Sequence, residues 1–274
     1  MNPPKHFETL RLTVSAAIAC VELNRPDRAN AMNMPMWDEL REAFTWIDQT
    51  PDIRVAILRG TGKHFCSGID LDMLTAISAE ITDPCKGRQS EKLRRLILNL
   101  QDTLTSLERC RKPVLAAIHG ACIGGGVDLV CACDMRYCSA ETHFSIKEVD
   151  LGLTADVGTL QRLPRLIGEG MVRELAYTGR NLGGSEAHAI GMVNRCYGSA
   201  EELHAEVMKL AQTIAAKSPL AVRGSKEMIS YARDHTIADG LNYVATWNAS
   251  MLLSDDLDEA IAAARAKRAP LYRD

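Results

Sequence analysis

Three acidic residues, Asp128, Glu148 and Asp156, stand in apolar or glycine-rich surroundings, where a carboxylate could move protons. Asp128 lies in "GGGVDLVCAC", which we expect to form a helix that is apolar on nearly every side. A carboxylate buried there is unfavourable unless it is paired or has a function. Taken alone, Asp156 fits the N-cap of a helix that starts in "VGTLQRL", so a role in proton transfer needs further support.

Two glycine-containing turns follow apolar runs and could present backbone N–H groups. One lies in "HFCSGIDL" after "VAILRG", and the other lies in "GACIGGGVDL" after "PVLAAIHG". Glycine allows close approach of a ligand, and the start of a helix favours negative charge. Each turn also has an ordinary structural explanation, since Asp70 can cap a helix and the glycines allow tight packing. Two N–H donors beside several acids nevertheless suggest an oxyanion hole with proton-transferring carboxylates.

The elements around these residues alternate between strand and helix. Short apolar runs predict strands near residues 9–14, 17–23, 53–60, 113–120, 134–139 and 143–146. Amphipathic patterns predict helices over 34–50 and 90–110. After residue 197 only helical patterns follow, opened by the capping-box pair Ser199 and Glu202. We therefore expect an α/β core over 1–197 and a helical region over 198–274.

Composition narrows the class of protein. The 274 residues carry a net charge of −3, which gives no positive field for nucleic acid. The nine cysteines mostly lie in apolar runs, with no zinc-like spacing, so we expect a reducing compartment and no metal. No signal peptide, membrane-spanning run or peroxisomal C-terminus is recognised, so we expect a cytoplasmic protein that does not bind membranes.

The order of motifs resembles the crotonase superfamily, also called the enoyl-CoA hydratase/isomerase superfamily. The resemblance runs from about residue 8 to the C-terminus and rests on "LNRPDRANAMN", "HFCSGIDL", "GACIGGGVDL" and "RLPRLIGEGMVRELAYTGRNLGGSEAHAIGMVN". It implies the ClpP/crotonase-like α/β fold, a spiral of ββα units that forms two sheets. It also implies that the helical region 198–274 serves trimerisation, giving a homotrimer or a hexamer that is a dimer of trimers.

The resemblance assigns a role to both turns. The backbone N–H groups of Ile69 and Gly125 would form the oxyanion hole for the thioester oxygen of an acyl-CoA. The substrate would be lined by Ser67, Gly68, Ile69, Asp70, Leu71 and Gly125. The turn with Arg28, Ala29 and Ala31 would approach the nucleotide end of CoA. No cofactor is implied, because coenzyme A is part of the substrate.

The acids point to one group within the superfamily. Hydratases carry two glutamates and have glycine at the position of Asp156, whereas the triplet Asp128, Glu148 and Asp156 resembles that of the Δ3,5-Δ2,4-dienoyl-CoA isomerases. That likeness implies the conversion of 3,5-dienoyl-CoA to 2,4-dienoyl-CoA in unsaturated fatty-acid β-oxidation. Glu148 would act at C2 and Asp156 at C6, while Asp128 would tune or orient Glu148. Two alternatives stay open: a 2-enoyl-CoA hydratase that uses Asp128 and Glu148, and a non-catalytic crotonase-like binding protein.

Overall fold

The centre of the protein is a six-stranded sheet in the computed structural model, which describes residues 7–274. Its strand order is β1-β2-β3-β4-β6-β9, and only the β1–β2 pair is antiparallel. The strands are β1 (Leu10–Ser15), β2 (Ile18–Leu23), β3 (Val55–Gly60), β4 (Val114–Ile118), β6 (Met135–Ser139) and β9 (Arg195–Tyr197). The central strands are buried along nearly their whole length, which explains their continuous apolar runs.

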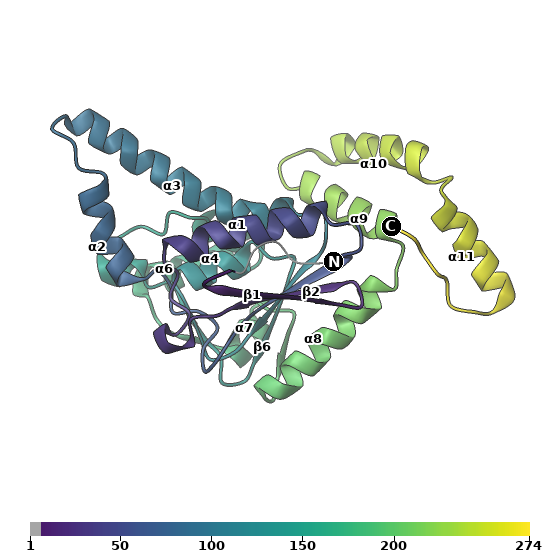
Figure 1. The fold of residues 1–274 in the computed structure, drawn as a ribbon, viewed down its shortest axis with the longest axis horizontal. Coiled ribbons are helices and arrows are strands. Elements are labelled where there is room, and N and C mark those ends of the chain that lie inside the picture. The colour runs from purple at the N-terminus through teal and green to yellow at the C-terminus, as the bar shows by residue number, and fades with distance from the viewer. Residues whose placement is uncertain (1–6) are drawn as a thin grey trace.

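Helices cover both faces of this sheet (Figure 1). Ala56 and Leu58 of β3 pack into the core beneath α1 (Met34–Gln49), whereas Val55 and Ile57 face α8 (Ala200–Ala215). This alternation is the period-two pattern of a strand that is buried on both sides. The long helix α3 (Lys86–Arg109) packs on α1 and projects beyond the sheet, where it meets α2 (Leu71–Glu80).

A smaller sheet brings the two glycine turns together. It contains β5 (Ala121–Ile123), β7 (His143–Ser145) and β8 (Leu182–Gly183) in the order β5-β7-β8. The backbone of Cys66 pairs with β5, through bonds from Cys66 N–H to Ala121 O (3.0 Å) and from Ile123 N–H to Cys66 O (2.9 Å). The turn after β3 and the turn after β5 are therefore neighbours, although more than fifty residues separate them in the chain.

Seven shorter helices lie between the strands, from residue 26 to residue 189. They are η1 (Pro26–Arg28), α4 (Gly125–Cys131), η2 (Glu148–Leu151), α5 (Thr159–Arg162), η3 (Leu163–Arg165), α6 (Glu169–Thr178) and α7 (Gly184–Ala189). Of these, α4 is buried at every residue, as its apolar composition predicts. Among residues 7–274 no helix is both long enough and apolar enough to cross a bilayer.

The C-terminal region consists of α8 and then α9 (Pro219–Tyr231), α10 (Ile237–Met251) and α11 (Asp255–Ala266). The last strand, β9, ends at Tyr197 and was not among the strands predicted from the sequence. Helix α8, however, contributes Leu203, Val207 and Ala211 to the core and so belongs structurally to the sheet. Only α10 and α11 extend away from it, and α10 buries no residue within the single chain (Figure 1).

Candidate active site

One cavity of about 720 Å³ gathers most of the residues that the sequence singles out. Its walls come from the 67–72 turn, the 123–125 turn, α3 and the segment 147–157. Asp128, Glu148 and Asp156 all line it, together with Ile69 and Gly125. Tertiary structure thus brings together three carboxylates and two backbone N–H groups that lie up to 87 positions apart in the chain, from Ile69 to Asp156.

The N–H groups of Ile69 and Gly125 are adjacent and lack hydrogen-bond acceptors within residues 7–274. Met32 holds the first turn, because its N–H donates to Gly68 O (2.8 Å) and its carbonyl accepts from Asp70 N–H (3.0 Å). Gly125 is the first residue of α4, where backbone N–H groups have no partner within the helix. The Ile69 nitrogen lies 3.7 Å from the point where a Cβ on Gly125 would stand. Two donors can therefore converge on one oxygen atom, as an oxyanion hole requires.

Glu148 lies against the second turn because Gly124 has no side chain. Gly124 adopts φ 48° and ψ −117°, a conformation essentially restricted to glycine. A Cβ there would stand 3.1 Å from Glu148 Oε1. Burial, and then the nearby charge of Asp128, raise the pKa of Glu148 to about 7. Glu148 is thus close to the oxyanion donors and can hold or release a proton near neutral pH.

Asp128 is completely buried, and its two carboxylate oxygens differ in their hydrogen bonding. Its Oδ1 accepts a hydrogen bond from Thr159 N–H (2.6 Å), and its Oδ2 has no partner among the described residues. Burial raises the pKa of Asp128 to about 6, although the bond from Thr159 acts in the opposite direction. Its charge raises the pKa of Glu148, and its bond with the Thr159 backbone also anchors the start of α5.

Asp156 is not a helix N-cap. The N-cap of α5 is Gly158, and the Thr159 N–H that a cap would accept is bonded to Asp128 instead. The Asp156 side chain lines the cavity and is accessible to solvent, and its partial burial raises its pKa. The pKa rises less at Asp156 than at Glu148, which is more deeply buried.

The expected substrate-lining residues are mostly in place. The cavity is lined by Arg28, Ala31, Ser67, Gly68, Ile69, Asp70 and Leu71. Ala29 is the exception: it does not line the cavity, and its carbonyl accepts a hydrogen bond from Ser67 N–H (3.0 Å). The carboxylate of Asp70 is engaged: it accepts from Arg25 (2.9 Å) and caps α2 through Asp72 N–H (3.0 Å). Asp70 therefore shapes the turn, as the structural explanation of that residue predicted.

Two features of the site escaped the sequence analysis. Asn30 is fully buried and ties the 25–31 turn to the chain after β3, with its amide donating to Thr61 O (2.9 Å) and His64 O (2.8 Å). The apolar wall of the cavity comes from α3 and from the segment around η2, through Leu93, Leu96, Ile97, Leu100, Leu151 and Leu153. The leucine stripe of α3 was a signal for this wall, but a stripe of that kind more often packs entirely into a core.

Fold and site together define an enzyme of the crotonase fold. The profile of the family described as enoyl-CoA hydratase/isomerase matches residues 13–274, and the chain belongs to that family. The structure resembles an enoyl-CoA hydratase from Bacillus anthracis with a TM-score of 0.88 at 30% identity, covering 97% of this chain and 99% of that one. The fold class expected from the sequence is thereby confirmed.

Two relatives make the likeness more specific. The chain is 49% identical to the peroxisomal Δ(3,5)-Δ(2,4)-dienoyl-CoA isomerase of Arabidopsis thaliana, over 99% of this chain and 98% of the relative. It is 47% identical to the mitochondrial Δ(3,5)-Δ(2,4)-dienoyl-CoA isomerase of Homo sapiens, over 95% of this chain and 80% of the relative. The resemblance to this group, inferred from three acids, is confirmed.

The same relatives contradict the cytoplasmic location expected from the sequence, because one is peroxisomal and the other is mitochondrial. The physical reason for the error is that unpaired, buried cysteines indicate only a reducing environment. They do not distinguish the cytoplasm from the interior of an organelle.

Proposed function

We propose that the protein isomerises 3,5-dienoyl-CoA to 2,4-dienoyl-CoA, as the names of its relatives suggest. The observation that carries the proposal is the presence of Asp156 in the same cavity as Glu148 and the two N–H donors. A second carboxylate farther along the cavity is needed only if a proton must be delivered at a remote carbon. Fatty-acid β-oxidation of unsaturated chains is the metabolic setting that this reaction would serve.

The first step takes place beside the oxyanion donors. The thioester oxygen accepts hydrogen bonds from Ile69 N–H and Gly125 N–H, which places C2 next to Glu148. Glu148 removes a proton from C2, and the electron pair of that C–H bond moves into a conjugated enolate that extends from the thioester oxygen to C6. The two donors stabilise the negative charge as it develops on oxygen, which is where such donors act most strongly.

The second step takes place at Asp156. Its protonated carboxyl donates to C6, the enolate electrons form the C2–C3 and C4–C5 double bonds, and the carbonyl is restored. Glu148 then carries the proton and Asp156 the charge, so exchange with solvent resets both groups. An acyl chain lying along the wall formed by Leu96, Ile97 and Leu100 would exclude water from Asp156 and raise its pKa further, which keeps the acid protonated until it is used.

Asp128 acts on this chemistry through its charge, without contacting the substrate carbon. Its charge opposes ionisation of Glu148, which makes Glu148 a stronger base once it is ionised. No metal or redox cofactor enters these steps, and coenzyme A takes part only as the carrier of the substrate. The substrate CoA would pass the turn that contains Arg28 and Ala31.

We further propose that the protein works as a homotrimer or as a dimer of trimers. The apolar residues Ile237, Leu241, Leu252 and Leu253 of the C-terminal region are between 56% and 91% exposed in the single chain. Apolar faces of that kind on a helical appendage usually meet a partner. Light scattering of the purified protein tests this, because a single 30.0 kDa species at micromolar concentration would contradict it.

The catalytic proposal is tested with two substrates. The protein is offered 3,5-octadienoyl-CoA and 2-octenoyl-CoA separately, and the ultraviolet change specific to each reaction is followed. Rapid formation of the 2,4-diene supports the proposal. Hydration of 2-octenoyl-CoA without isomerisation of the diene would instead identify a hydratase that uses Asp128 and Glu148. Binding of both substrates without any turnover would identify a non-catalytic binding protein.

A further inference from the structure

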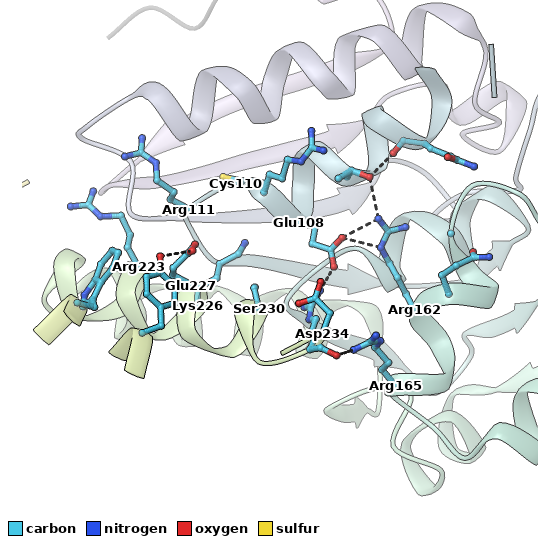
Figure 2. Close-up of a pocket in the computed structure, with 18 of the residues that line it drawn as sticks. Glu108, Cys110, Arg111, Arg162, Arg165, Arg223, Lys226, Glu227, Ser230 and Asp234 are labelled. Carbon is cyan, nitrogen blue, oxygen red and sulfur yellow. Dashed lines mark hydrogen bonds and ion pairs between the residues drawn. The ribbon is translucent and has the colours of Figure 1, made fainter. Parts of the chain in front are cut away.

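A second cavity of about 1060 Å³ (Figure 2) adjoins the substrate cavity at residues 156–158. Val157 lines both cavities, and Gly158 lines the second one. The Asp156 side chain therefore projects from a thin wall. Whatever supports the far side of that wall determines where the carboxylate sits.

Asp156 depends on its backbone for its position. Its carboxylate accepts no hydrogen bond from another residue in the part of the chain that the structure describes. Its carbonyl accepts a bond from Gln101 Nε2 of α3 (2.6 Å), and the Thr159 N–H is held by Asp128 (2.6 Å). These two hydrogen bonds fix Asp156 and Thr159, the two ends of the segment 156–159. A further contact is required to fix Val157 and Gly158 between them.

Arg162 supplies that third contact from the second cavity. Its Nη1 lies 3.4 Å from Val157 O, while its Nη2 bonds Thr105 Oγ1 of α3 (3.2 Å). The guanidinium can reach this place only because residue 158 is glycine. A Cβ on Gly158 would stand 1.8 Å from Arg162 Nη1, and the φ of 134° also disfavours any other residue.

Glu108 orients Arg162 and joins it to the C-terminal region. Glu108 Oε2 accepts from Arg162 Nε (3.2 Å) and Nη2 (3.0 Å), and its Oε1 accepts from Arg233. Arg233 lies between α9 and α10, and its carbonyl accepts from Arg165 Nη1 (2.5 Å). Figure 2 shows Glu108 and Arg162 facing each other on the cavity wall, with Arg165 and Asp234 close by.

We propose that Arg162 and Glu108 are positioning residues for Asp156, and that Arg233 links them to the C-terminal helices. Together they fix the wall so that the Asp156 carboxyl faces C6 of the substrate. This inference rests on the proposed isomerase function. Simple stabilisation of the fold is the competing explanation, because the side chains of Arg162 and Glu108 are only 16% and 23% exposed. The kinetic comparison below, together with melting temperatures, separates the two roles. Displacing a reacting group by about 1 Å can reduce a rate about 100-fold.

The test compares kcat and KM for 3,5-octadienoyl-CoA in four variants. Arg162→Met should lower kcat about 10- to 100-fold and leave KM within about twofold, because substrate contacts are untouched. Glu108→Gln keeps one acceptor oxygen for two arginines and should also lower kcat. Arg162→Lys, which keeps the charge but not the fork of donors, should recover part of the loss. Arg173→Met, which breaks an exposed pair with Glu169 on α6, is the matched control and should retain the parent kcat.

A double-substitution cycle separates positioning from general damage. If Arg162 acts through Asp156, adding Arg162→Met to Asp156→Asn should lower kcat no further than Asp156→Asn alone. Melting temperatures identify any variant that fails to fold, in which case Glu108→Gln and Arg162→Lys carry the test. The positioning role would be overturned, and the proposed function left standing, by either of two results. One is a parent-like kcat in Arg162→Met and Glu108→Gln. The other is an equal loss of kcat when Arg162→Met is added to the parent and to Asp156→Asn. A parent protein that does not isomerise the diene would overturn the proposed function as well.

Discussion

Replacing Glu148 with Gln should stabilise the protein at alkaline pH while abolishing proton transfer at C2. Burial and the charge of Asp128 raise the pKa of Glu148 to about 7 from an ordinary value of 4.5. The folded protein therefore holds this proton more tightly than the unfolded chain does. Stability contributed by the protonated form is complete below about pH 4.5 and is lost as the pH rises through about 7.

The size of the effect follows from the two pKa values. Linkage between them gives a destabilisation of about 3 kcal/mol at pH 8 and of under about 1 kcal/mol at pH 5. Gln cannot ionise, so Glu148→Gln should exceed the parent in free energy of unfolding by up to about 3 kcal/mol at pH 8 and by much less at pH 5. The figure is an upper bound, because the new amide also needs hydrogen-bond partners in the site.

Urea denaturation at pH 5 and pH 8, at one fixed protein concentration, measures this difference. Glu169→Gln is the matched control, because Glu169 is an exposed glutamate on α6 whose side chain is 67% accessible. Its substitution should change stability little and equally at both pH values. If the free energy of unfolding of Glu148→Gln differs from that of the parent by the same amount at pH 5 and pH 8, ionised Glu148 does not destabilise the folded protein. The reasoning is then wrong.

Three further substitutions test the site. Asp156→Asn should lower the isomerisation rate at least about 100-fold with an unchanged melting temperature, because Asp156 caps no helix; a parent-like rate would favour a hydratase. Asp128→Asn keeps the bond to Thr159 but removes a like charge, so a carbon-13 NMR titration should place the pKa of Glu148 below the parent's value of about 7; an unchanged midpoint would remove Asp128 from its tuning role. Gly124→Ala should destabilise by about 1–3 kcal/mol and lower kcat, because its Cβ would press on Glu148. Gly170→Ala, inside α6 and with open space for a Cβ, should do neither in parallel melting and rate measurements.

The sequence by itself determined the elements and the chemical groups. Runs such as "VAILRG" and "PVLAAIHG" form β3 and β4, because an apolar run bounded by turn residues has few alternatives to a buried strand. The run Gly124–Gly126 in "GACIGGGVDL" opens α4 where the composition indicated, since backbone conformation at a glycine run is a local property. Asp128 is buried for the same reason, because its neighbours in that helix are apolar on every side.

Only the tertiary structure decided how these groups meet. Spacing made Asp156 a plausible N-cap, but the acceptor that reaches Thr159 N–H is Asp128, which lies 31 positions earlier in the chain. Helix α8 follows the last strand and yet completes the core, because one face of the sheet would otherwise be uncovered. The ion pairs of Glu108 with Arg162 and Arg233 join α3, α5 and the loop between α9 and α10. Hydrogen-bond partners are chosen by distance in space, and a single sequence records only distance along the chain.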